Sequence, residues 1–253
     1  MPLPYNTEFF ESIDSGSHSS ALKIVPLVLN AFSKQIHTVI DVGAGSGAWT
    51  KTFLDEGLSV TSVDGAYARE QYERVRNAYP NHVFVASDLS HSILPERAPR
   101  FDLAVCLEVA EHLPEGRAAG FVKDLCGLAD AVLFSAAIPY QGGTEHINEQ
   151  WMAYWAKLFR EHHFQSCDFL RTEIWNDVDV EWWYKQNIVL YLNEAGTHRL
   201  RSCRKNLVTV TAPISIVHPE AYLWANHTEQ RRQKYETYGK DRYLYREGLR
   251  EPQ

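Results

Sequence analysis

The sequence lacks several features that would place it in a class at once. No apolar run reaches the roughly 18 residues that a membrane-spanning helix needs, so we expect no membrane partner. The four cysteines are widely spaced and form no Cys-x-x-Cys pair, which argues against a disulfide framework or a thiolate zinc site. The N-terminal residues offer neither a basic region nor an apolar segment, so no signal peptide is expected and the predicted location is the cytoplasm.

The chain also has no excess of basic residues. Its 25 Lys and Arg stand against 32 Asp and Glu, which gives a formal net charge of −7. Nucleic-acid binding over a long footprint needs a clustered basic face, so a nucleic-acid partner is not expected. A small-molecule or glycan acceptor, including a small anionic one, stays open, and so does the oligomeric state.

The chain has 253 residues, of which 45% are hydrophobic. This is enough apolar sequence for one substantial core. We predict a single domain over residues 1–225, with an N-terminal helical cap over about 1–35 and a core over about 36–193. Residues 226–253 are densely charged and predict an exposed helix or tail.

A glycine-rich turn is the most informative motif. Residues 39–49 read Val-Ile-Asp-Val-Gly-Ala-Gly-Ser-Gly-Ala-Trp, and residues 60–65 follow as Val-Thr-Ser-Val-Asp-Gly. The pattern predicts a buried strand, a turn, a helix and a second strand that ends on Asp64. This is the nucleotide-binding half of a Rossmann-like unit. Because Gly43, Gly45 and Ala48 satisfy the dinucleotide spacing, that motif alone leaves two cofactor classes open, dinucleotides and S-adenosylmethionine.

The acids around the turn separate the two classes. Asp41 stands two residues before Gly43, where a dinucleotide would dock its pyrophosphate on the helix N-terminus, and a carboxylate there would repel phosphates. S-adenosylmethionine carries two cationic groups instead. Asp64, Asp88 and Glu108 each follow a predicted strand, and open α/β sheets bind ligands at the carboxyl ends of their strands. Four acids at four such ends favour a cationic cofactor, with Asp88 accepting from the adenine amino group and Leu89 packing on its ring.

Combined motifs at 39–47, 62–64, 86–89 and 101–112 resemble the class I S-adenosylmethionine-dependent methyltransferases. The resemblance covers residues 35 to 193. It implies an α/β fold with a Rossmann-like, seven-stranded, mostly parallel sheet, an antiparallel last strand and helices on both faces. It also implies cofactor contacts in the glycine motif and at the strand ends, which are Asp41, Gly43, Gly45, Gly47, Asp64, Asp88, Leu89 and Leu107. Shorter stretches at 142–151, 183–187 and 217–219 resemble a subgroup linked to polysaccharide and sugar-modifying gene clusters.

Coarse periodicity places these motifs on elements. Residues 19–32 predict a helix with serine caps, and strands alternate with helices from 37 to about 137. A loop over 138–147 then leads to a helix over about 148–163 that Asn148 can cap. The last two strands are expected over 164–175 and 186–193, with an insertion at 176–184 between them.

Residues 108–112, Glu-Val-Ala-Glu-His, form the main catalytic candidate. On a helical turn, Glu108, Glu111 and His112 would share one face. Together with His146 from the loop after the fifth strand, they could hold Mg²⁺ or Mn²⁺. In the metal-free alternative His146 is the general base, with His112 and Glu108 as further catalytic candidates. A purely structural role for the cluster also stays open.

The resulting function hypothesis is a methyltransferase that acts on a small molecule, by O-methylation of a sugar, sugar nucleotide or glycan intermediate. Its cofactor would be S-adenosyl-L-methionine and its product S-adenosyl-L-homocysteine. The alternatives are a metal-dependent methyltransferase on another hydroxylated natural product or an RNA end, an NAD(P)-dependent dehydrogenase, and a non-catalytic methyltransferase-like scaffold subunit.

Overall fold

The computed structural model describes residues 7–93, 99–203 and 208–225. The chain divides into two compact units, Met1–Ile216 and Val217–Gln253. The described part of the second unit contains helix α9 (Pro219–Ala225), and the predicted charged segment 226–253 lies outside the described residues. Within the described ranges, no helix combines the length and apolarity needed to cross a membrane.

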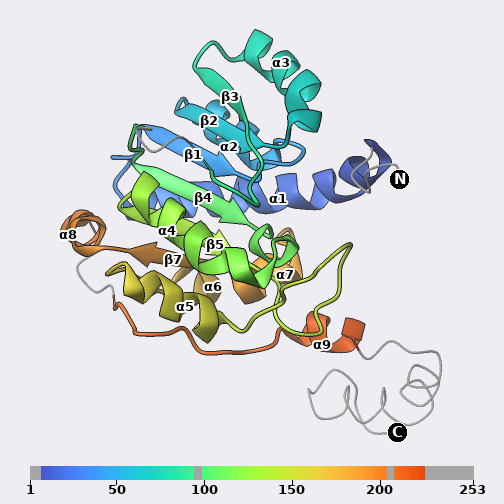
Figure 1. Ribbon diagram of the computed structural model, residues 1–253. Helices are drawn as coiled ribbons and strands as arrows, with labels where there is room; N and C mark the ends of the chain where they lie inside the picture. Colours follow the sequence, from blue (N-terminus) through green and yellow to red (C-terminus); the bar gives the residue numbers. More distant parts are fainter. Residues whose placement is uncertain (1–6, 94–98, 204–207, 226–253) are drawn as a thin grey trace, which may run out of the picture. The chain divides into compact units, whose positions relative to one another are not determined.

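A seven-stranded sheet forms the centre of the first unit, in the order β3-β2-β1-β4-β5-β7-β6 (Figure 1). Strands β1 to β5 pair in parallel, whereas β7 runs antiparallel to both β5 and β6. The predicted sheet with a reversed last strand is therefore confirmed. The strands are β1 (Thr38–Val42), β2 (Ser59–Asp64), β3 (His82–Ala86), β4 (Leu103–Leu107), β5 (Ala131–Ser135), β6 (Gln165–Cys167) and β7 (Val189–Leu192).

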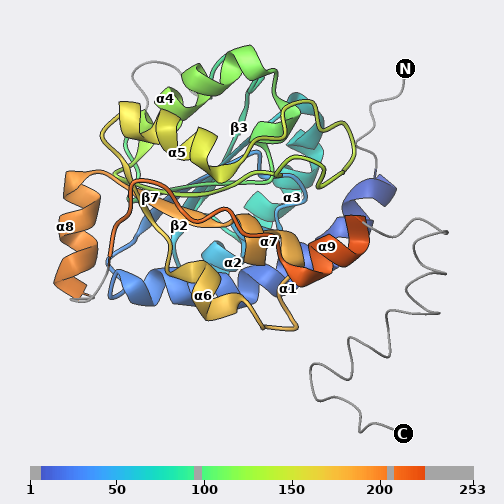
Figure 2. The same ribbon diagram turned by 90° about the horizontal axis from the view of Figure 1, so that it is seen from below.

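Helices cover both faces of this sheet, as the two views show: α1 and α6 lie on one face, α4 and α5 on the other (Figures 1 and 2). Two apolar clusters explain the layers, because alternate residues of each strand point to opposite faces. Val39 belongs to the cluster that also contains Trp49 and Phe53 of α2. Ile40 belongs to the opposite cluster, with Phe121 and Trp155. The helices of this unit are α1 (Thr7–Ala31), α2 (Ala48–Asp55), α3 (Arg69–Ala78), α4 (Ala118–Leu128), α5 (Met152–Glu161), α6 (Leu170–Ile174), α7 (Trp182–Asn187) and α8 (Glu194–Cys203).

Several predicted boundaries are wrong. The first helix begins at Thr7, well before residue 19. The strand expected over 164–175 is only three residues long, and the chain then forms α6. Buried Leu170 and Ile174, one helical turn apart, both pack into the α1 side of the core, which explains the helix. Likewise, helix α5 starts at Met152, and its N-cap is Trp151 rather than Asn148.

The direction of the strands determines which segments meet. Strands β1, β2, β4 and β5 are parallel, so their carboxyl ends lie at one edge of the sheet. Because β7 runs the opposite way, with Val189 opposite Phe134, the start of β7 lies at this same edge. Residues 186 and 187, which end α7, therefore lie at the carboxyl ends of β4 and β5.

Candidate functional site

The glycine turn between β1 and α2 needs its glycines because the backbone is left-handed at three of them. Gly43, Gly45 and Gly47 have φ of +73°, +53° and +86°, a region that costs other residues about 1–2 kcal/mol each. Gly43 also approaches Val109 so closely that a Cβ would lie 2.4 Å from its Cγ2. Gly47 is the N-cap of α2. The turn therefore ends with the helix N-terminus at the carboxyl edge of the sheet.

Asp64, the last residue of β2, is bonded directly to this turn. Its Oδ2 accepts the backbone N–H of Gly45 at 2.7 Å, and its Oδ1 accepts that of Gly65 at 2.6 Å. The hydroxyl of Tyr67 also donates to Oδ1. The structure thus brings together two of the predicted cofactor residues, Gly45 and Asp64, and adds Tyr67, which no sequence motif indicated.

Asp41 is buried beneath the turn, with 3% of its surface exposed. Thr50 of α2 donates its hydroxyl to Oδ2 of Asp41 at 2.7 Å, and the same hydroxyl lies 2.7 Å from Ser62 Oγ. Ser62 Oγ in turn is 3.0 Å from Nε2 of His82. Burial raises the pKa of Asp41 to about 7, against the hydrogen bond from Thr50, and the charge of Asp64 adds to the rise. A buried polar chain thus crosses β1, β2 and β3 under the glycine turn.

Asp88 lies apart from these acids and is mostly exposed, with 68% of its side chain accessible. Its Oδ1 accepts the N–H of Ser90 at 3.0 Å and the Ser90 hydroxyl at 2.7 Å, and Oδ2 lies 3.0 Å from Nδ1 of His91. These bonds, chiefly those from Ser90, lower the pKa of Asp88. Its neighbour Leu89 is partly buried against the α4 side of the core, and Arg117 Nε donates to the Leu89 carbonyl at 3.0 Å.

Glu108 follows Leu107, the buried last residue of β4. Its φ is +54°, and its N–H donates to the carbonyl and hydroxyl of Ser135 at 3.0 and 3.1 Å. The expectation that Glu108 shares a helical turn with Glu111 is therefore wrong. A single 3₁₀ turn covers only Ala110–His112, because the bonds to β5 hold Glu108 in a left-handed conformation.

Side-chain amides surround the carboxylate of Glu108. Gln141 Nε2 donates to Oε2 at 3.0 Å, and Asn187 Nδ2 donates to Oε1 at 3.2 Å. The two amides also bond to each other at 2.8 Å, and Gln186 Nε2 reaches Gln141 Oε1 at 3.2 Å. Burial raises the pKa of Glu108, and its bonds from Ser135, Asn187 and Gln141 oppose the rise. Gln141, Gln186 and Asn187 were not predicted as site residues. The expected reversal of the last strand could have indicated two of them, because it places the residues before β7 at the carboxyl ends of β4 and β5.

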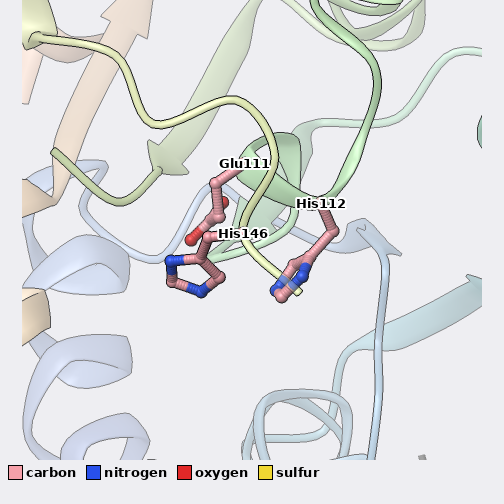
Figure 3. Close-up of side chains that lie close together, drawn as sticks. All are labelled: Glu111, His112 and His146. Atoms are coloured by element: carbon pink, nitrogen blue, oxygen red, sulfur yellow. The ribbon is translucent and has the colours of Figure 1, made fainter. Parts of the chain in front are cut away.

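Glu111, His112 and His146 converge, the first two from the segment after β4 and the third from the loop after β5 (Figure 3). One potential ligand atom from each lies within 4.8 Å of the others. The imidazole rings of His112 and His146 meet edge to face with centroids 4.8 Å apart. Of the four residues predicted as a metal site, the structure gathers these three, and the carboxylate of Glu108 is bound instead by the amides.

Glu111 is fully buried. Its Oε1 accepts the N–H of Ala137 at 3.1 Å, while Oε2 has no hydrogen-bond partner among the described residues. Burial raises the pKa of Glu111 well above its ordinary value, and the nearby Glu108 carboxylate adds to this. Burial and the charge of His146 lower the pKa of His112 to about 4. A buried carboxylate oxygen without a partner beside neutral imidazole favours a cation or a proton at this position.

Glu149, which was not predicted as a site residue, fixes His146 within the loop between β5 and α5. Oε1 of Glu149 lies 3.0 Å from Nδ1 of His146. Farther along, the N–H groups of Ile147 and Asn148 both donate to the Glu111 carbonyl at 2.9 Å. The spacing His146-x-x-Glu149 was visible in the sequence, but nothing in the pattern showed that the loop folds back on itself.

Comparison with known proteins agrees with this architecture. Residues 40–125 match the family described as a methyltransferase domain. A ubiquinone biosynthesis O-methyltransferase from Pseudomonas paraeruginosa is 30% identical over 79 residues, which cover 31% of this chain and 34% of that protein. The alignment thus spans about a third of the length of the curated relative.

Solved structures share the fold over most of the chain. The magnesium protoporphyrin IX methyltransferase of Synechocystis with bound S-adenosylhomocysteine superposes with a TM-score of 0.56 at 20% identity, over 73% of this chain and 88% of that one. DesVI of Streptomyces venezuelae gives 0.53 at 10% identity, over 74% and 95%. The protein therefore has the Rossmann-like fold of the methyltransferases, and its segment 40–125 matches the methyltransferase domain.

Proposed function

We propose that this protein is an S-adenosylmethionine-dependent methyltransferase that methylates a hydroxyl group of a small molecule. The observation that carries the proposal is the glycine turn with a carboxylate on each side: Asp64 is bonded to Gly45, and Asp41 is buried beneath. A carboxyl group beneath this turn favours a cationic cofactor over the pyrophosphate of a dinucleotide. Because burial raises the pKa of Asp41 to about 7, this preference grows as the pH rises above neutral and Asp41 loses its proton. The dehydrogenase alternative is disfavoured for that reason.

In this proposal Asp64 binds the ribose hydroxyls, and the glycine turn lets the cofactor approach the backbone closely. Leu107 lies at the end of β4 beside this edge. The adenine role of Asp88 requires it to exchange its bonds to Ser90 and His91 for the adenine amino group. Asp88 is exposed, so this exchange needs only a local rearrangement of its turn.

Methyl transfer to oxygen is a direct displacement. The acceptor hydroxyl attacks the methyl carbon, the carbon–sulfur bond breaks, and the hydroxyl proton passes to a base. His146 is the proposed base, since a neutral imidazole has a ring nitrogen that can accept a proton. Its side chain is mostly buried, with 12% accessible, so an acceptor would have to reach the small part of the ring that stays exposed.

For the acceptor we propose a sugar, sugar nucleotide or glycan intermediate. The shorter resemblance of residues 142–151, 183–187 and 217–219 to sugar-modifying relatives supports it, and the O-methyltransferase relative supports oxygen as the acceptor atom. The net charge of −7 weighs against an RNA end. The intact carboxylates at the turn weigh against a non-catalytic scaffold.

A metal-dependent version of the same reaction is favoured by one observation. The buried Oε2 of Glu111, which lies beside His112 and His146, accepts no hydrogen bond from the part of the chain that the structure describes. One carboxylate and two imidazoles suit a divalent ion such as Mn²⁺ better than Mg²⁺, which prefers oxygen ligands. An ion at about 2.1 Å from each ligand needs donors roughly 3–3.5 Å apart, so the three groups would have to move closer. A bound ion would supply activation of the acceptor hydroxyl.

Calorimetric titration with S-adenosylhomocysteine tests the proposal directly. We expect binding to the wild type, a large loss of affinity in Asp64→Ala and little change in His146→Ala. A parallel NADH fluorescence titration should show no binding. Absence of S-adenosylhomocysteine binding, or NADH binding in its place, would refute the cofactor assignment. Titration with Mn²⁺ alone, comparing the wild type with Glu111→Gln, decides the metal-dependent version.

A further inference from the structure

Glu149 holds three separate points of the loop between β5 and α5. Its Oε2 accepts the N–H of Tyr140 at 2.7 Å, and its Oε1 accepts the N–H of Gly142 at 2.9 Å. Oε1 also lies 3.0 Å from Nδ1 of His146. With backbone donors on both oxygens, each oxygen of Glu149 acts as an acceptor.

This contact determines the tautomer of His146. A carboxylate oxygen can only accept, so Nδ1 of His146 must carry the hydrogen. In the neutral imidazole the lone pair then resides on Nε2. Nε2 is therefore the nitrogen that can accept a proton from an acceptor hydroxyl or ligate an ion.

The orientation of the His146 ring is constrained on two further sides. Gly143 has φ of +153°, and a Cβ on it would lie 2.3 Å from both Cε1 and Nε2 of His146. The ring of His112 meets that of His146 edge to face. The ring thus fits between Gly143 and His112, and Glu149 holds the ring at Nδ1.

The position of the loop is fixed separately from this orientation. Ile147 and Asn148 donate their N–H groups to the carbonyl of Glu111, and Gln150 donates to that of Ala137 at 3.2 Å. These backbone bonds place the loop against the segment after β4 without involving the carboxylate of Glu149. Loss of that carboxylate should therefore release the His146 ring and the N–H groups of Tyr140 and Gly142, while residues 147 to 150 keep their backbone bonds.

We propose that Glu149 is the positioning residue of His146: it fixes the Nδ1–H tautomer and the ring orientation, and keeps the Nε2 lone pair available for the reaction. The inference rests on the proposed function for its catalytic meaning, but its structural content stands alone. Carboxylates in this relation to a histidine raise its basicity and stabilise the imidazolium that forms when it takes a proton. Glu149 itself does not touch the acceptor.

Nitrogen-15 NMR of the imidazoles tests this without any acceptor, because protonated and bare ring nitrogens differ widely in chemical shift. The chain has eleven histidines, so the His146 signals are assigned by their loss in His146→Asn. At about pH 8.5, where an ordinary imidazole is neutral, we expect the wild type to carry the hydrogen on Nδ1. In Glu149→Gln we expect a substantial population with the hydrogen on Nε2.

The matched control is Glu161→Gln, which removes an exposed carboxylate at the end of α5 and should leave the His146 spectrum unchanged. Two results would overturn the inference: hydrogen on Nε2 in the wild type, or an unchanged His146 tautomer in a folded Glu149→Gln variant. The wild-type spectrum decides even if that variant does not fold. Titration of the wild type and Glu149→Gln with S-adenosylhomocysteine should give equal affinities; failure of the wild type to bind would refute the proposed function and leave the tautomer result standing.

Discussion

The hydroxyl of Tyr67 donates a hydrogen bond to Oδ1 of Asp64, the same carboxylate that accepts the backbone N–H groups of Gly45 and Gly65. Tyr67 comes from the short turn after β2 and remains about half exposed. In the proposed function a ribose hydroxyl must bond to Asp64. The tyrosine hydroxyl therefore competes with the cofactor for one carboxylate oxygen.

Replacing Tyr67 by phenylalanine should raise the affinity for S-adenosylhomocysteine. The variant removes the competing hydroxyl, and a hydrogen bond to a charged group contributes about 1.5–3 kcal/mol. Since water partly replaces the hydroxyl, we expect a gain of about three- to tenfold, measured by calorimetry.

Tyr79→Phe is the control for this measurement, because the hydroxyl of Tyr79 also bonds to a carboxylate, that of the exposed Asp55. It should leave cofactor affinity unchanged. A loss of affinity in Tyr67→Phe would mean that the hydroxyl orders Asp64 for the cofactor and does not compete with it.

The fold was predictable to a large extent because its signals are local. The alternation of apolar strands and helices indicated the parallel sheet, and the glycine turn located its first crossover. The turn and Asp64 are joined by a bond between residues only nineteen positions apart. The prediction of a strand over 164–175 was wrong. From the sequence alone, Leu170 and Ile174 are compatible with a helix as well as with a strand, and only their packing on the α1 side of the core decides for the helix.

The candidate site was less predictable because its contacts join distant segments. Glu108 meets Asn187, 79 positions later, only because β7 is reversed and α7 ends at its start. Glu149 is close to His146 in sequence, but their bond depends on the fold of the loop. In that fold the N–H groups of Tyr140 and Gly142 also donate to the Glu149 carboxylate. Residue types suggested the chemistry, whereas partners and orientations required the folded chain.

The buried carboxyl of Asp41 should make stability fall as pH rises. Burial raises its pKa from 3.8 to about 7, so the folded chain binds this proton more tightly than the unfolded chain does. The stabilising effect is complete below about pH 4 and is lost as pH rises toward 7. At about 1.4 kcal/mol per pH unit, this amounts to at most about 4 kcal/mol.

Asp41→Asn isolates this effect, because the amide oxygen can still accept from Thr50 while carrying no charge. Denaturant unfolding of the cofactor-free proteins should show the variant more stable than the wild type at pH 8 and equally stable at pH 4. Asp55→Asn, at the exposed end of α2, is the control. A difference between Asp41→Asn and the wild type that does not vary with pH would contradict the buried, proton-binding carboxyl.

In the glycine turn, the cost of backbone strain can be separated from the cost of steric crowding. Gly43 and Gly57 have similar φ, +73° and +84°, but only Gly43 has a neighbour within reach of a Cβ, namely Val109. Gly57→Ala should therefore cost only the left-handed backbone penalty of about 1–2 kcal/mol. Gly43→Ala should cost about 1–3 kcal/mol more, because its methyl group overlaps Val109.

A double-mutant cycle with Val109→Ala tests this explanation, since it removes the crowded methyl groups and leaves φ unchanged. In that background Gly43→Ala should cost no more than Gly57→Ala does in the wild type, as measured by the free energy of unfolding. The coupling between positions 43 and 109 would then equal the steric part of the penalty. If Gly43→Ala costs the same free energy in the wild type and in the Val109→Ala background, the segment after β4 does not constrain the turn. Backbone conformation alone would then explain why position 43 is glycine.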